Sequence, residues 1–110
     1  MAFDKEMELN IKNAIACEYI AATTNYGVEY NSEHEGFAVL LEEMEEAQAE
    51  FCNATIQKNL YWRLVKGEKI NFTKSEVLDQ LEKSATAAIK EIVQVVAVVK
   101  KIKKTREGVL

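Results

Sequence analysis

Residues 40–51 read LLEEMEEAQAEF, a run in which glutamates stand among leucines and other helix-forming residues. In a helix, Glu43, Glu46 and Glu50 share one face because they are spaced three and four residues apart. Like charges at this spacing repel one another by roughly 0.2–0.5 kcal/mol per pair. Water, basic side chains or a divalent cation can offset that repulsion. The stretch therefore predicts a helix with a candidate site for Mg²⁺, which prefers carboxylate oxygens.

The scarcity of helix-breaking residues predicts the fold class. The chain has 110 residues, with no proline and only four glycines. Long uninterrupted helices need few such residues, whereas a strand-rich fold needs many turns. Apolar residues make up 48% of the chain, which is enough for a core and argues against disorder. We therefore predict one all-α domain over residues 1–110.

The charge balance excludes one class of partner. A net charge of −4 leaves no electrostatic footprint for nucleic acid. Basic residues nevertheless crowd the C-terminal end of the chain, namely Lys100, Lys101, Lys103, Lys104 and Arg106. A helix C-terminus favours cations, so this cluster fits the end of a helix. The functional alternative is a patch that attracts phosphate.

Three observations predict a cytoplasmic protein without a membrane partner. Residues 1–6 are acidic and lack the apolar core of a signal peptide. No run approaches the roughly 18 apolar residues of a membrane span. Cys17 and Cys52 make neither a disulfide framework nor a CxxC site, so we expect them to be small reduced core residues.

Three helices are expected, over about residues 5–24, 33–66 and 74–104. Each segment follows a residue whose side chain caps helix N-termini: Asp4, Ser32 and Thr73. Glu35 and Glu76 stand three residues after the last two caps, which makes two capping boxes. Gly27 and Gly67 follow the first two segments, where a left-handed residue is common. The mixed residues 59–65 suggest a break in the second helix.

The third segment predicts self-association. From Ala85 to Val99 nearly every residue is apolar, and the main interruptions are Thr86, Lys90, Glu91 and Gln94. A helix that is apolar almost all round must be buried on most sides. Two other helices do not cover it easily, so a second copy is the natural cover. We expect a bundle of three to four helices, completed as a homo-oligomer, either a dimer or a tetramer.

Glu91 and Gln94 form a second candidate pair on one face of this apolar helix. An ionised carboxylate among apolar neighbours is costly unless a cation or hydrogen bonds compensate it. If Glu91 faces the glutamates of the second helix, bound Mg²⁺ or Mn²⁺ would offset the combined charge. The alternative is that Glu91 pairs with a lysine or lies in an exposed groove.

These two acidic motifs together resemble a known family. The pattern Glu-Glu-x-x-Glu at residues 42–46 and the later Glu91-Ile92-Val93-Gln94 look like the MazG-like branch of the all-α nucleoside triphosphate pyrophosphohydrolases. That family carries Glu-x-x-Glu on one helix and Glu-x-x-Asp on a later one. Residues 34–43 and 90–97 resemble small MazG-like proteins often found in phage and prophage.

The resemblance implies Mg²⁺-dependent cleavage of a nucleoside triphosphate to the monophosphate and pyrophosphate, in a helical bundle that assembles as a dimer or higher oligomer. Carried over by position, Glu43 and Glu46 would be catalytic metal ligands. Glu91 would be the third ligand, and Glu50 would hold a second metal or a water. The carboxylates would hold the ions and orient the attacking water.

Gln94 departs from the family pattern because it stands where the family has an aspartate. A neutral amide is a poorer ligand for a hard cation and cannot act as a base. This departure supports an alternative, a non-catalytic MazG-like helical protein that binds a nucleotide or a protein partner. A third interpretation is a small bundle whose acidic residues form only a solvated face.

Further substrate contacts are expected from the second helix and from Gln94. Lys58 and Arg63 can meet phosphate oxygens, and surface solvation is their alternative role. Trp62, Tyr61 and Tyr30 can stack on a nucleobase, although aromatic residues near a bundle end also serve as core or interface.

Overall fold

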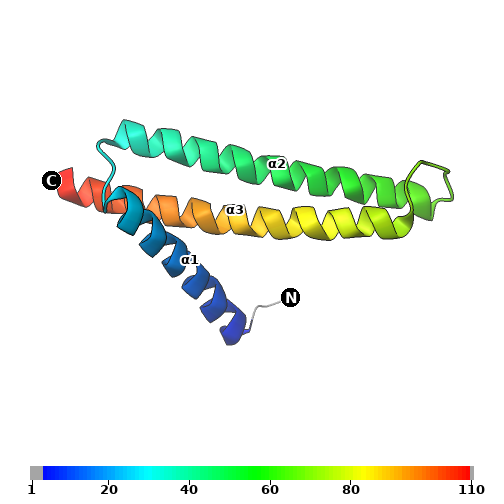
Figure 1. Ribbon diagram of the computed structural model, residues 1–110, viewed down its shortest axis with the longest axis horizontal. Helices are drawn as coiled ribbons and strands as arrows, with labels where there is room; N and C mark the ends of the chain where they lie inside the picture. Colours follow the sequence, from blue (N-terminus) through cyan, green and yellow to red (C-terminus); the bar gives the residue numbers. More distant parts are fainter. Residues whose placement is uncertain (1–3, 110) are drawn as a thin grey trace. The chain divides into compact units, whose positions relative to one another are not determined.

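The computed structural model describes residues 4–109, which form three α-helices and contain no strand. Helix α1 spans Lys5–Tyr26, α2 spans Glu33–Val65 and α3 spans Lys74–Val109 (Figure 1). The prediction of an all-α chain is thus confirmed over the described residues, while residues 1–3 of the N-terminal stretch lie outside them. Within this part of the chain, no helix combines the length and the apolar character that crossing a bilayer requires.

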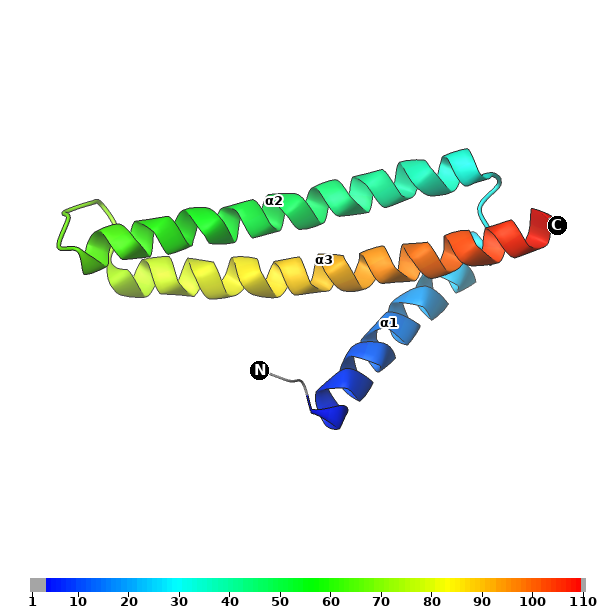
Figure 2. The same cartoon turned by 180° about the vertical axis from the view of Figure 1, so that it is seen from behind.

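The helices are divided between two compact units. One comprises Met1–Met44 and Glu91–Leu110, and the other comprises Glu45–Lys90. In the second unit, the last part of α2 and the first part of α3 run antiparallel, side by side, and residues 66–73 join them (Figures 1 and 2). The first unit combines α1, the start of α2 and the last part of α3. A single domain over residues 1–110 stays a prediction.

The first and third helices begin where the capping residues predict. The Asp4 carboxylate accepts a hydrogen bond of 2.7 Å from the backbone N–H of Met7. Thr73 and Glu76 form a reciprocal capping box, in which each side chain accepts a bond of 3.1 Å from the backbone N–H of the other. Both arrangements satisfy backbone donors that a helix N-terminus leaves without intrahelical partners.

The second helix uses only half of the predicted capping box. Ser32 Oγ accepts a hydrogen bond of 3.1 Å from the backbone N–H of Glu35, as expected. The Glu35 carboxylate, however, accepts hydrogen bonds from Asn31, at 3.0 Å from its side-chain amide and 3.4 Å from its backbone N–H. Asn31 offers two donors at one position, which explains why the carboxylate reaches one residue further back than the motif predicts.

Gly27 and Gly67 end the first two helices with positive φ angles of 89° and 90°. After α2, the N–H groups of Gly67 and Glu68 donate to the carbonyls of Leu64 and Arg63, which is a Schellman motif. The predicted break at residues 59–65 is wrong, because α2 continues to Val65. That stretch contains neither glycine nor proline, the residues that usually cause sharp kinks. Helix α3 extends beyond its predicted end, to Val109.

The apolar core of the described residues is very small. Its buried apolar side chains are Ala47, Val77 and Ala97. Cys17 and Cys52 are both exposed, so the prediction that they are core residues is wrong. For Cys17 the reason is that α1 has no buried residue.

Large apolar side chains form an exposed stripe along α2. Phe37, Leu41, Met44 and Phe51 are 61%, 47%, 45% and 68% exposed, and their spacing places them on one helical face. We call these four residues the α2 stripe. On α3, Ile89, Ile92 and Val99 are also exposed. A single copy of the chain therefore leaves much of its apolar surface in water.

A buried hydroxyl ties the segment before α2 to the last part of α3. Thr105 is 2% exposed, and its Oγ1 accepts a hydrogen bond of 2.9 Å from the backbone N–H of Tyr30. The same hydroxyl donates to the carbonyl of Lys101 at 2.9 Å. Close packing continues at Gly36, where an added Cβ would lie 2.9 Å from Ile102 Cγ1. These contacts hold the start of α2 against α3 within the first unit.

Replacing Thr105 with valine should lower the free energy of unfolding by about 1–3 kcal/mol. Valine keeps the shape of threonine but leaves the partly buried Tyr30 N–H without its acceptor. Urea unfolding followed by circular dichroism measures the change. Thr105→Ser is the matched control, since it keeps the hydroxyl and loses only a methyl group, at a cost of about 0.8 kcal/mol. A Thr105→Val protein as stable as the wild type would contradict this account.

Candidate functional site

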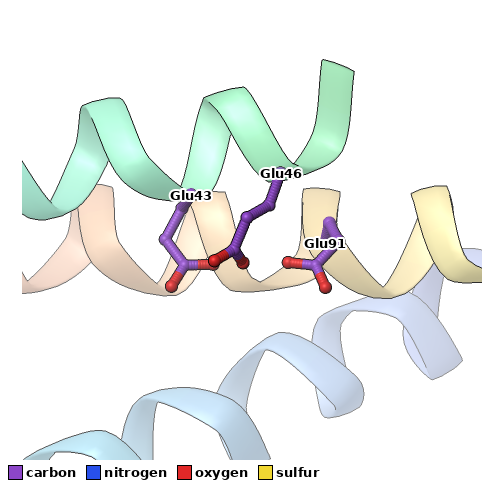
Figure 3. A group of neighbouring side chains, drawn as sticks. All are labelled: Glu43, Glu46 and Glu91. Atoms are coloured by element: carbon purple, nitrogen blue, oxygen red, sulfur yellow. The ribbon is translucent and has the colours of Figure 1, made fainter. Parts of the chain in front are cut away.

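Three glutamates from two helices form a group of carboxylates. Glu43 and Glu46 of α2 and Glu91 of α3 each offer an oxygen, and these oxygens lie within 4.8 Å of one another. Figure 3 shows the three side chains converging. Glu43 and Glu91 belong to the first unit and are half-buried, while Glu46 follows Glu43 by one turn of α2 and is exposed. The group contains three of the four predicted metal ligands.

Glu50, the fourth predicted ligand, does not belong to this group among the described residues. It stands one further turn along α2 and is half-buried. Glu42 and Glu45, expected to face water, are both exposed. The remaining three carboxylates can supply oxygen ligands to a hard divalent cation, leaving further coordination positions for water or a phosphate oxygen. Acidic groups of this kind also exist as simply solvated surface.

Gln94 links the acids of the first unit. With its amide oriented to satisfy both carboxylates, its nitrogen lies 2.8 Å from Glu91 Oε2 and 3.2 Å from Glu43 Oε2. A side-chain amide carries two N–H donors, so one nitrogen serves both acceptors. Hydrogen bonds to ionised groups are stronger than neutral ones. Gln94 thus holds Glu43 and Glu91 together and offsets part of their repulsion without a charge of its own.

A pocket of about 380 Å³ begins at this group and lies entirely within the first unit. Glu43 and Gln94 belong to its lining. The other polar and aromatic lining residues come from α1, the segment before α2, α2 and α3: Glu18, Tyr26, Tyr30, Glu35 and Lys101. Small apolar side chains complete the wall. The size and the mixed lining suit a small organic ligand.

Lys101 and Tyr30 form a cation–π pair in this pocket. Lys101 is only 4% exposed, and its Nζ lies 4.3 Å from the centre of the Tyr30 ring. Burial, together with the negative charges of Glu35 and Glu43, raises the pKa of Tyr30 above its ordinary value. The phenol therefore keeps its proton at neutral pH and remains a hydrogen-bond donor.

The place of Lys101 differs from the sequence interpretation of the C-terminal lysines. Helix α3 continues to Val109, so Lys101 lies two turns before its end and is buried. The macrodipole acts mainly within the last turn and does not explain this position. The spacing in the sequence does indicate that Lys101 lies near Gln94. Lys101 follows Gln94 by seven residues, so the two share one helical face.

Comparisons with family models, with curated proteins and with solved structures found no match for this chain. The resemblance to the MazG-like family therefore rests on the acidic motifs, and arguments about function rest on the residues and their geometry.

The other predicted substrate contacts lie further along α2. Lys58, Trp62 and Arg63 follow Glu46 by 12 to 17 residues, which places them about 18–26 Å away along the helix axis. Arg63 Nε lies 3.1 Å from Glu68 Oε1, and this hydrogen bond lowers the pKa of Glu68. Lys66 Nζ lies 5.7 Å from the centre of the Trp62 ring. Helix α2 does not bring Lys58, Trp62 and Arg63 to Glu46, and their contact with substrate stays a prediction.

Proposed function

We propose that the protein is a MazG-like nucleoside triphosphate pyrophosphohydrolase that depends on Mg²⁺ or Mn²⁺ and acts in the cytoplasm. The substrate would be an NTP or dNTP, and the products the monophosphate and pyrophosphate. The observation that carries the proposal is the convergence of Glu43, Glu46 and Glu91, whose carboxylate oxygens lie within 4.8 Å of one another. These are the residues that the family resemblance selects as ligands.

Each acidic residue has a role in this proposal. Glu43, Glu46 and Glu91 would hold the cation, and Glu50 would bind a second cation or a water. A bound divalent cation supplies charge stabilisation to phosphoryl oxygens and lowers the pKa of a bound water. The carboxylates would orient that water toward the phosphorus, and Gln94 would keep Glu43 and Glu91 in place through its amide.

The proposal includes a homo-oligomer, as a dimer or tetramer. A core whose buried apolar side chains are two alanines and one valine is small for a chain of 110 residues. The α2 stripe leaves two phenylalanines, a leucine and a methionine in water. A second copy of the chain that covered this stripe would add the missing apolar burial.

The contacts of Gln94 support a second candidate function, a non-catalytic MazG-like protein that binds a nucleotide or a protein partner. The amide donates hydrogen bonds to Glu91 and Glu43 at a position where the family has an acid. It therefore compensates two carboxylates in the absence of a cation, and it cannot accept a proton from water.

Pyrophosphate release from a panel of ordinary and modified NTPs and dNTPs, with Mg²⁺ or Mn²⁺, tests the proposal. We expect equal amounts of monophosphate and pyrophosphate, and no release when a chelator is present. Release of orthophosphate would indicate a different cleavage. Absence of any release from a folded, oligomeric protein would favour the non-catalytic candidate.

A further inference from the structure

Lys101 contributes the one ammonium group to the lining of the pocket. Its side chain is almost wholly buried, and none of the ion pairs among the described residues includes it. The Tyr30 ring attracts the ammonium group but offers no lone pair for its three N–H donors. Among the described residues no buried side-chain nitrogen or oxygen lacks a hydrogen-bond partner, so the ammonium group is not an orphaned donor. Because Lys101 lines the pocket, its N–H groups can donate to an acceptor on a ligand that fills the pocket.

The charges around the pocket indicate which kind of acceptor fits. Three carboxylates, those of Glu18, Glu35 and Glu43, line it together with the one ammonium group of Lys101. A phosphate would meet more like charge than opposite charge there, so a neutral acceptor is favoured. Ionised carboxylates accept hydrogen bonds and donate none. The part of a ligand that fills the pocket should therefore be neutral, with N–H donors for the acids and a carbonyl oxygen for Lys101.

An aromatic surface is also available. Tyr26 lines the pocket and is 80% exposed, so its ring is open for stacking, whereas a face of the Tyr30 ring is covered by Lys101. Stacking on aromatic side chains is a general way in which proteins hold planar bases. A planar heterocycle with an amino group and a ring carbonyl fits this lining. Its amino group donates to the carboxylates, its carbonyl accepts from Lys101, and its ring stacks on Tyr26.

We propose that this pocket holds the nucleobase of the ligand and that Lys101 selects a base with both a ring carbonyl and an amino group, namely cytosine or guanine. Adenine has the amino group but lacks the carbonyl, and uracil has carbonyls but lacks the amino group. For the rest of the nucleotide the inference rests on the proposed function, since Glu43 lines the pocket and also belongs to the carboxylate group. Lys101 follows Gln94 by seven residues on α3, which is about 10 Å along the helix axis, a distance that a nucleoside phosphate spans.

Metal-free binding of nucleosides tests the base pocket separately from hydrolysis. Titrations of the full chain with cytidine, uridine and adenosine, followed by NMR chemical shifts, should give an affinity for cytidine about tenfold above that for adenosine. Uridine should bind more weakly than cytidine. Lys101→Met should remove the preference for cytidine over adenosine, because methionine keeps the length of the side chain and loses its donors. Lys100→Met, which changes the exposed neighbouring lysine, is the matched control and should retain the preference.

Two outcomes would overturn the inference: equal affinities of the wild type for cytidine and adenosine, or an unchanged preference in Lys101→Met. If Lys101→Met does not fold, Glu18→Gln provides the second test, since removing one acceptor charge should weaken cytidine binding several-fold. Lys101-dependent cytidine binding without pyrophosphate release from any nucleotide would support the pocket and overturn the hydrolase proposal. Pyrophosphate release from all bases alike, unchanged by Lys101→Met, would support the hydrolase and overturn the pocket.

Discussion

Replacing Glu43 with glutamine should reduce metal-dependent pyrophosphate release by at least about 100-fold, since even the outer partners of metal ligands cost 10–100-fold when removed. Glutamine keeps the volume of glutamate and removes the charge that a hard cation prefers. Glu46→Gln and Glu91→Gln should have effects of similar size, because each removes the negative charge of one of the three converging carboxylates. Initial rates across a Mg²⁺ titration distinguish a weakened metal site from a slower chemical step.

Glu42→Gln and Glu45→Gln are the matched controls for this experiment. Both residues stand in the same acidic run, both are exposed, and neither belongs to the carboxylate group of the described residues. Each substitution removes the same unit of charge from the same helix, so a general electrostatic effect would appear in these variants too. If the controls lost as much metal-dependent pyrophosphate release as Glu43→Gln, the assignment of Glu43, Glu46 and Glu91 as metal ligands would be contradicted.

Glutamate in place of Phe37 and Phe51 should convert the proposed homo-oligomer into monomers and lower its melting temperature. The two side chains are 61% and 68% exposed in the single chain, and burying each one in an interface is worth roughly 1.5–3 kcal/mol. A carboxylate at either position would instead have to be desolvated without a partner. Analytical ultracentrifugation measures the mass, and the melting temperature of the wild type should rise with protein concentration.

Ile56→Glu separates this effect from a general loss of surface apolarity. Ile56 is 53% exposed and lies on α2, about 100° around the helix from Phe37 and thus outside the α2 stripe. The control should keep the oligomeric mass of the wild type. A wild-type protein that is monomeric at tens of micromolar, or an unchanged mass when both phenylalanines are replaced, would show that the stripe is not the interface.

Local chemistry made the helix boundaries predictable. Asp4, Ser32 and Thr73 cap the helices that follow them, and Gly27 and Gly67 adopt positive φ angles after the first two. Each of these contacts spans only a few residues, so its cause lies within the sequence window itself. Three local expectations differ from the structure: the break at residues 59–65, where no glycine or proline interrupts the backbone, the full Ser32–Glu35 capping box, and the end of α3.

Burial was much less predictable from the sequence. Cysteine is a residue type that is usually buried, which predicts core positions for Cys17 and Cys52, yet both are exposed. The cluster of C-terminal cations that includes Lys101 fits the end of a helix or a phosphate-attracting patch, yet Lys101 is among the most buried residues described. Burial depends on which faces of distant helices meet, and average preferences of residue types do not contain that information.

The helical character of the chain, the starts of its helices and the shared face of Glu43 and Glu46 all follow from the amino-acid pattern alone, because a helical period of 3.6 residues acts over a few positions. Tertiary packing was needed to bring Glu91 and Gln94 to Glu43, and to place Lys101 over the Tyr30 ring in a pocket that Glu18 and Glu35 also line. Those contacts join residues that are 48 to 71 positions apart. Their formation depends on how α1, α2 and α3 pack in the first unit, which the spacing within any one helix does not specify.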